Sequence, residues 1–398
     1  MSYHALSCLS QETDSERAGL DVARKIRDGF GSRKVAAVVV YATINHDQAA
    51  MLRGLREGIG PGVTVVGCSG QGVMGNGNVL EGGYVVGAIG LGGEGLKVAS
   101  ARADAVEVDG VGKGRELARS LTQQLGREPK LMLLVYDPLK GVDVNEILAG
   151  TRQAVSSPIV GGAASQPAGP VAGTYQYHGD QAFNGGAVAL GLDGDFEVDL
   201  GLSHGVSPTG IVVTLTKAEG NKLYELDGRP ALDVWRESVG AGENDIFGQE
   251  HIGALAMGIE RRIVEDGKQE AVYLIRAVFG VDRDAKAVVV QAGIPEGSKI
   301  MFHHRTVPVV KEGTVAMGMD LRERLAGKNP WAVFGFECGG RTTPFLGPAE
   351  TLDENLTLQK LVAPQAPWLG LIAWGEIAPC GGEAEFHNYT YPLVVLSQ

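Results

Sequence analysis

Residues 35–43 read VAAVVVYAT, an unbroken apolar run rich in side chains that branch at Cβ. Such a run is typical of a β-strand that is covered on both faces. A helix is predicted before it, because Thr13 and Glu16 have capping-box spacing and apolar residues recur at helical intervals up to Phe30. After it, residues 46–58 have a helical pattern and residues 63–67 form a second apolar strand. This order predicts an α/β unit.

A similar order recurs about ninety residues later. Residues 131–136 (LMLLVY) form an apolar strand, residues 142–155 have a helical pattern, and Ile159 begins a strand that meets a loop of small residues. Each copy continues into a strand-like segment, at 82–91 and at 184–192. The sequence therefore predicts an internal duplication in the N-terminal half, with units packed about a pseudo-twofold axis. The alternative is a chance likeness, since α/β segments often look alike.

The second half has a different pattern of apolar and polar residues. Strands with an alternating pattern, such as 210–215, follow the first 200 residues, and residues 231–239 have a helical pattern. Residues 221–228 look like a hinge between the halves. With 398 residues the chain exceeds the usual size of a single core. We predict an α/β to α+β architecture of two subdomains, residues 1–223 and 224–398, with mixed β-sheets flanked by helices.

Charge and composition exclude several classes of protein. The chain has 35 basic and 47 acidic side chains and a net charge of −12, which argues against nucleic acid and anionic membranes as partners. It has neither an apolar run of about 18 residues nor the features of a signal peptide, so we expect no membrane insertion and a cytoplasmic location. Cys8, Cys68, Cys338 and Cys380 are scattered, which suits neither a disulfide framework nor a thiolate zinc site.

Two motifs are misleading. Residues 70–75 (GQGVMG) match the dinucleotide pattern G-x-G-x-x-G directly after a strand. The next residues, 76–78 (NGN), disfavour the helix that a nucleotide site needs, so we interpret the motif as a loop of close backbone approach. His303 and His304 are adjacent, and on a strand they would point to opposite faces. We therefore expect one buried and one exposed imidazole and no shared metal.

The strongest local chemistry lies in the last seventy residues or so. Cys338 follows an apolar strand and lies close in sequence to Arg341, and a nearby cation makes a thiolate more available. Glu376 ends another apolar segment, and His387 and Asn388 follow soon after. These groups could converge on a small ligand at the strand ends. They could equally be buried groups that satisfy one another.

Taken together, these segments resemble the FIST family, whose members are sensory proteins built of a FIST N-terminal and a FIST C-terminal domain. The resemblance covers nearly the whole chain, and its motifs are weak singly but specific in their order and spacing. In the N-terminal part they are 65–69 (VVGCS) with Gly72, 159–163 (IVGGA), 183–186 (FNGG), and Asn221 with 226–231 (LDGRPA). In the C-terminal part they are Phe336-x-Cys338-x-Gly340-Arg341, Gly375-Glu376-Ile377 and Phe386-His387-Asn388-x-Thr390.

The resemblance implies a sensor of small molecules, for which amino acids and their derivatives are suggested ligands. One branch of the family resembles haem-binding nitric-oxide sensors that regulate histidine kinases, and a eukaryotic branch joins the module to an F-box. We recognise no kinase, cyclase, chemotaxis or F-box segment in this sequence. We therefore expect either a separate signalling partner, such as a histidine kinase, or an action on the ligand itself.

Three functions stay open, and the first is favoured over an enzyme. The first is a stand-alone sensor that holds an amino-acid-like or other small polar metabolite in a cleft between its halves, with no cofactor. Its candidate ligand-binding residues are Cys338, Arg341, Glu376, His387, Asn388, Gly161, Gly162 and Cys68. The second is a haem-binding gas sensor, whose axial ligand would be His178, His204, His303, His304 or His387. The third is an enzyme with Cys338 as nucleophile and His387 as base.

Overall fold

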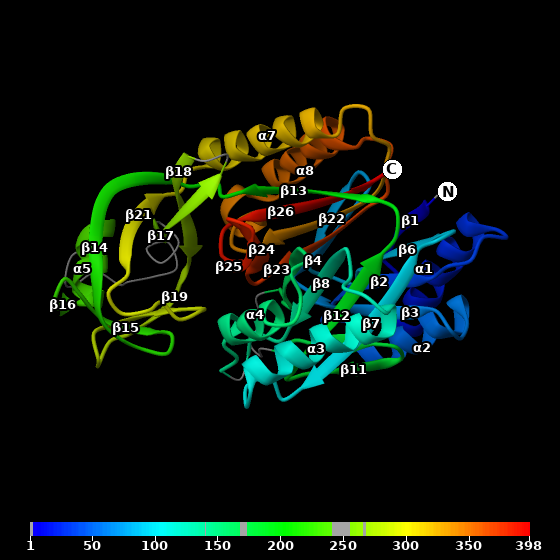
Figure 1. The fold of residues 1–398 in the computed structure, drawn as a ribbon, viewed down its shortest axis with the longest axis horizontal. Helices are drawn as coiled ribbons and strands as arrows, with labels where there is room; N and C mark the ends of the chain where they lie inside the picture. The colour runs from blue at the N-terminus through cyan, green and yellow to red at the C-terminus, as the bar shows by residue number, and fades with distance from the viewer. Residues whose placement is uncertain (1–2, 140, 168–172, 241–254, 266–267) are drawn as a thin grey trace.

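The computed structural model describes residues 3–139, 141–167, 173–240, 255–265 and 268–398, which form a body with an attached lobe (Figure 1). The body holds three six-stranded sheets, and the lobe holds a fourth, curved sheet. Helices and mixed sheets are combined, as the sequence predicts. Among the described helices, none has the length and apolarity needed to cross a membrane.

In the described part of the chain, one order of elements occurs three times in the body. The first unit is β1 (Tyr3–Ser10), α1 (Ser15–Phe30), β2 (Ala37–Thr43), α2 (Gln48–Ile59), β3 (Thr64–Gly70), the hairpin β4 and β5 (Gly72–Gly75 and Asn78–Glu81) and β6 (Val86–Gly93). The second unit is β7 (Lys97–Asp104), α3 (Gly110–Leu125), β8 (Leu131–Tyr136), α4 (Val144–Arg152), β9 (Ile159–Ala163), the hairpin β10 and β11 (Gln176–His178 and Gln181–Phe183) and β12 (Gly186–Asp193).

The third unit has the same order, but the lobe is inserted after its first strand. It consists of β13 (Glu197–Ser203), α7 (Val307–Arg324), β22 (Pro330–Cys338), a π-helical turn (Thr342–Leu346), α8 (Pro348–Val362), β23 (Trp368–Ala373), the hairpin β24 and β25 (Glu376–Cys380 and Glu383–His387) and β26 (Tyr391–Ser397). The duplication predicted for the N-terminal half is therefore confirmed, and the structure adds a third copy that the sequence analysis missed.

The three units exchange their hairpins in a cycle. The strands β1-β6-β2-β3 are completed by the hairpin β10-β11 of the second unit. The strands β7-β12-β8-β9 are completed by β24-β25 of the third unit, and β13-β26-β22-β23 by β4-β5 of the first. Each unit thus completes the sheet of another unit, which ties residues far apart in the sequence into one body.

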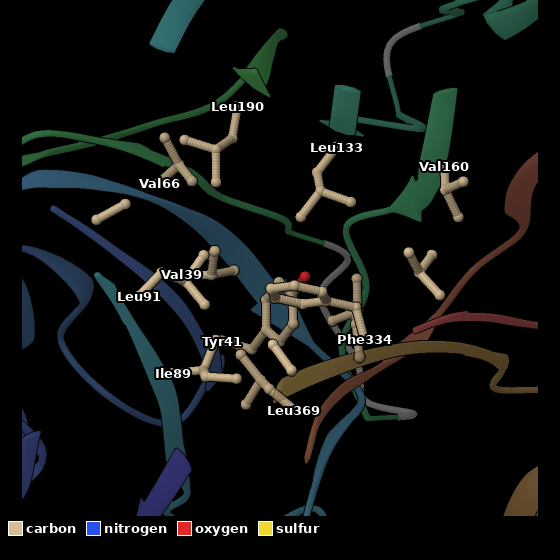
Figure 2. Close-up of a cluster of buried hydrophobic side chains, with 14 of the residues drawn as sticks. Val39, Tyr41, Val66, Ile89, Leu91, Leu133, Val160, Leu190, Phe334 and Leu369 are labelled. Atoms are coloured by element: carbon tan, nitrogen blue, oxygen red, sulfur yellow. The ribbon is translucent and has the colours of Figure 1, made fainter. Parts of the chain in front are cut away.

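The central strands are apolar at every position because both faces of each sheet are covered. In β2, Val39 and Tyr41 belong to a core shared by the three sheets, whereas Val38 and Val40 pack in the core beneath α1 and α2. Figure 2 shows Tyr41 in the shared core, close to Phe334 of the third unit. The helix pairs lie on the outside, as α7 and α8 do along the top edge of Figure 1.

The lobe, at the left of Figure 1, is a curved sheet with one described helix packed on it. Its elements are β14 (Ser207–Glu219), β15 (Lys222–Leu226), β16 (Arg229–Pro230), α5 (Ala231–Val239), β17 (Leu255–Glu265), β18 (Lys268–Arg276), β19 (Val278–Asp282), β20 (Ala287–Val290) and β21 (Lys299–His304). Trp235 of α5 and Phe302 of β21 pack edge to face in the core of the lobe. The lobe therefore has a core of its own.

Some local predictions hold and others fail. The segment after Gly70 continues as strand β4 with no helix, so the dinucleotide motif is a decoy as expected. His303 is buried and His304 is exposed, also as expected. The predicted hinge at 221–228 is wrong, because these residues form β15 and its flanking turns inside the lobe. The predicted domain boundary, between 223 and 224, falls within β15 and stays a prediction.

Gly161 of β9 should be required for packing. A Cβ atom built at Gly161 would lie 1.8 Å from the backbone oxygen of Leu134 in the paired strand β8. We expect Gly161→Ala to lower the free energy of unfolding by about 1–3 kcal/mol in urea denaturation. Gly280→Ala is the matched control, because a Cβ at this strand glycine meets nothing within 4 Å. Equal stabilities of the two variants would contradict this prediction.

Candidate functional site

The residues predicted at the C-terminal strand ends do come together, but they are buried. Cys338 ends β22, Glu376 begins β24 and His387 ends β25, where it pairs directly with Glu376. The Cys338 thiol donates a hydrogen bond to the Glu376 carboxylate, so these two residues do share one cluster. Glu376 and His387 have no exposed surface, and Cys338 is 5 % exposed.

Burial explains the charge state of Glu376. It raises the pKa of this carboxyl group to about 8, although several donors oppose the shift. The donors are the Thr390 hydroxyl at 2.8 Å and the backbone N–H groups of Thr390 and Gly375, both at 3.1 Å. Glu376 thus accepts hydrogen bonds from its own neighbours, and its role in ligand binding stays a prediction.

This pKa predicts a pH dependence of stability. Because the pKa of Glu376 is higher in the folded chain than its ordinary value of 4.5, stability is lost as the pH rises through about 8. We expect the free energy of unfolding of the wild type to fall between pH 5 and pH 8 relative to Glu376→Gln, by up to ~1.4 kcal/mol per pH unit. Urea denaturation at both pH values measures this difference, and a difference that does not change with pH would contradict the prediction.

Arg341 lies in a separate buried cluster and does not pair with Glu376. Its guanidinium contacts two carboxylates, that of Glu354 at 2.5 Å and that of Glu337 at 3.5 Å. Arg341 and Glu337 have no exposed surface, and Glu354 is 2 % exposed. Burial and the Glu354 carboxylate hold the pKa of Glu337 well above its usual range. The arrangement is an internal ion cluster that fixes α8 against β22.

Asn388 links the body to the lobe. Its side-chain oxygen accepts from the backbone N–H of Ala277 at 3.0 Å, and its side-chain nitrogen donates to Gln291 at 2.9 Å. Its backbone N–H donates to the carbonyl oxygen of Ile275 at 3.0 Å. Asn388 thus has a defined role at the junction without a ligand.

The remaining predicted ligand contacts lie inside the body. Cys68 is fully buried in the shared core, and burial raises the pKa of its thiol well above the usual value. Gly162 lies opposite Glu376, and a Cβ there would lie 2.9 Å from the backbone oxygen of Gly375. Neither Cys68 nor Gly162 lines the cleft between the body and the lobe or the apolar hollow beside His204.

The cysteines should differ in reactivity. Burial raises the pKa of the Cys338 thiol, and Cys68 is buried as well, whereas Cys8 and Cys380 are partly exposed. Because alkylation needs an accessible thiolate, we expect iodoacetamide to label Cys380 and Cys8 before Cys338 and Cys68 in the folded protein. Peptide mass spectrometry measures the order, and labelling in urea, where all four should react alike, is the control. Fastest labelling at Cys338 would instead support a nucleophilic role.

A cleft of about 450 Å³, lined by side chains of both charges, lies between the body and the lobe and is here called the interlobe cleft. This volume lies within the usual range of small-ligand pockets, ~300–1,000 Å³. The body side comes from the start and end of α4 and from β25, and the lobe side from β17, β18 and the loop before β21. Its charged lining residues are Asp143, Arg152, Glu260, Arg261, Arg276, Lys299 and Glu385.

Arg276 is the most unusual group in the interlobe cleft. It is only 2 % exposed, and its Nη1 donates to the carbonyl oxygens of Phe386 and Ile275. Its Nε has no hydrogen-bond partner, and among the described residues no carboxylate lies within ion-pair distance. Burial lowers the pKa of Arg276 to about 10, so the group remains charged at neutral pH. A buried cation without a paired anion is costly unless it meets a ligand.

The sequence analysis missed Arg276 because no motif contains it. The available signal was the segment 272–279 (VYLIRAVF), in which one arginine interrupts an apolar strand. Arg152, Arg261 and Lys299 gave no signal of their own, since they meet at the interlobe cleft only through the fold.

The structure brings together three of the five histidines considered as haem ligands. His204 and His303 line an apolar hollow of about 260 Å³, and the His387 ring lies 5.8 Å from the His204 ring. His178 instead contacts the Ser100 hydroxyl at 3.0 Å. The hollow is smaller than pockets for drug-sized ligands, so a haem does not fit it. Haem binding stays a prediction from the resemblance alone.

Comparison with known proteins identifies relatives along the whole chain. Residues 36–229 match the FIST N domain and residues 231–379 match the FIST C domain. An uncharacterized protein of Mycobacterium tuberculosis strain H37Rv is 27% identical over 409 residues, which cover 97% of this chain and 98% of the relative. A protein of Mycobacterium bovis is 25% identical, with 96% of each chain covered. A cyanuric acid hydrolase from A. caulinodans aligns over 99% of both chains at 11% identity, with a TM-score of only 0.35.

Proposed function

Because this chain belongs to the FIST family, we propose that it is a sensor whose ligand, an amino-acid-like metabolite, binds in the interlobe cleft. FIST domains are described as sensory domains that bind small ligands. The observation that carries the proposal is the buried guanidinium of Arg276, which lines the cleft, lies over the Phe386 ring and, among the described residues, donates hydrogen bonds only to carbonyl oxygens. A carboxylate of the ligand would complete its coordination.

The other charges of the interlobe cleft favour a ligand that carries both signs. The cations Arg152, Arg261, Arg276 and Lys299 share the cleft with the carboxylates of Asp143, Glu260 and Glu385. Arg152 is held by the Ala384 carbonyl and lies 3.9 Å from the Glu385 carboxylate. An α-amino acid would offer its carboxylate to Arg276 and its ammonium group to one of the acidic residues.

The position of the interlobe cleft suits a sensor. A ligand there would touch the body and the lobe at once and would favour one arrangement of the two. Asn388 and Gln291 form a hydrogen bond across the junction. A change in the arrangement of the lobe would reach the body through this contact. We infer that a separate protein, such as a histidine kinase, reads the change.

Thermal-shift screening of the amino acids and the corresponding keto acids tests this function. We expect at least one α-amino acid to raise the melting temperature in a concentration-dependent way. Its keto acid should act more weakly, because it lacks the ammonium group. If no amino acid or keto acid stabilises the protein, the proposal is wrong.

A further inference from the structure

A second hollow lies on the opposite face of strand β18 from the interlobe cleft. Leu274 and Arg276 line the cleft, whereas Tyr273 and Ile275 line the hollow of about 260 Å³. Tyr273 and Ile275 point to the opposite face of the strand from Leu274 and Arg276, so this part of β18 separates the two spaces. We call this space the histidine hollow, and its main lining residues are His204, Val206, Val272, Tyr273, Ile275 and His303.

The walls of the histidine hollow are apolar and aromatic. The Tyr273 and His303 rings pack edge to face at 4.9 Å between centroids. Space for the His303 ring is kept by Gly258, where a Cβ would lie 2.3 Å from the His303 Cε1 atom. The hollow is thus built around rings that offer edge and face contacts to another ring.

The histidine hollow is lined by two imidazole rings, of His204 and His303, in the neutral state. His303 donates from Nδ1 to the Met301 carbonyl at 3.0 Å, which assigns its proton to Nδ1 and leaves Nε2 as an acceptor. Burial lowers the pKa of His204 to about 4, and the Arg341 charge acts in the same direction. Burial also lowers the pKa of His303. A ligand in the histidine hollow would therefore contact neutral imidazole rings and could donate a hydrogen bond to the Nε2 atom of His303.

We propose that the histidine hollow is a second ligand site, which takes a small neutral aromatic compound carrying one ring N–H or O–H group. An engineered apolar cavity of about 150 Å³ binds benzene, so the histidine hollow has room for a two-ring compound such as indole. The aromatic walls would hold the rings, and the N–H group would donate to the Nε2 atom of His303.

Such a compound would act as an effector of the interlobe cleft. His204 belongs to the chain between β13 and β14, where the body passes into the lobe, and Tyr273 and His303 belong to the lobe sheet. Strand β18 would then lie between the two ligands, with the aromatic compound on one face and the ligand of the cleft on the other. This inference does not depend on which ligand the cleft binds.

Isothermal titration of the full chain with indole and with 1-methylindole tests the proposal. We expect saturable binding of indole and roughly tenfold weaker binding of 1-methylindole, which lacks the donor. Val206→Trp should fill the histidine hollow and abolish indole binding, because Val206 lines the hollow. Val212→Trp is the matched control, because Val212 is a 47% exposed valine that does not line the hollow.

Further variants keep the outcome decisive. If Val206→Trp fails to fold, His303→Phe keeps a ring at this position and should bind indole and 1-methylindole equally. Indole binding is measured in the absence of amino acids, so a failure here is distinguishable from a failure of the cleft proposal. Absence of indole binding by the wild type, or unchanged binding by folded Val206→Trp, would overturn the proposal.

Discussion

Arg341→Ala is expected to destabilise the folded protein by about 3–5 kcal/mol. The substitution removes the only cation in contact with Glu354 and Glu337 within the described residues, and it leaves the Glu354 carboxylate buried without a cation. A buried charge without a partner costs far more than a surface ion pair contributes. Urea denaturation measures the loss, provided that the variant is soluble enough to purify.

A rescue experiment separates the charge effect from the loss of packing. Arg341→Met combined with Glu354→Gln and Glu337→Gln removes the charges together, and we expect it to regain most of the lost stability. Arg324→Ala is the control, because this arginine is 40% exposed and pairs with Asp320 on the surface of α7. If Arg341→Ala were no less stable than Arg324→Ala, the buried ion cluster would have no structural role.

Arg276→Gln is expected to weaken binding of the amino acid identified by thermal shift roughly ten- to hundredfold. Hydrogen bonds to a charged group contribute about 1.5–3 kcal/mol, and each 1.4 kcal/mol is a factor of ten in affinity. Isothermal titration measures the change. Arg276→Lys should weaken binding less than Arg276→Gln does, because lysine keeps the positive charge. It should still weaken binding, because lysine lacks the planar fork of donors.

The matched control for Arg276 is Arg53→Gln. Arg53 is 60% exposed and pairs with Glu16 on the helices of the first unit, away from the interlobe cleft. We expect this variant to bind the amino acid as the wild type does. Unchanged affinity in a folded Arg276→Gln variant would contradict the assigned role of Arg276.

The sequence analysis recovered the elements whose pattern is local. The apolar strands β2 and β8 and the helices between them stand out because both faces of each sheet are covered. The third unit escaped notice because the lobe separates β13 from α7 by about a hundred residues. The cyclic exchange of hairpins has no local signal, since each hairpin pairs with a strand of another unit.

The ligand-binding residues stay a prediction, whereas their places in the fold are now known. Cys338, Glu376 and His387 do meet, but as buried groups at strand ends. A sequence segment rich in reactive groups therefore corresponds to a packed junction of buried strand ends. The interlobe cleft depends on tertiary structure, because Arg152 and Arg276 come from different units of the fold and approach only when the lobe is inserted.

A crystal structure of the protein with the most stabilising amino acid would test the central claim most directly. We expect the ligand in the interlobe cleft, with its carboxylate within about 3.2 Å of the Arg276 guanidinium and its ammonium group beside an acidic residue of the cleft. Ligand density at any other place, with the cleft holding only water, would contradict the account.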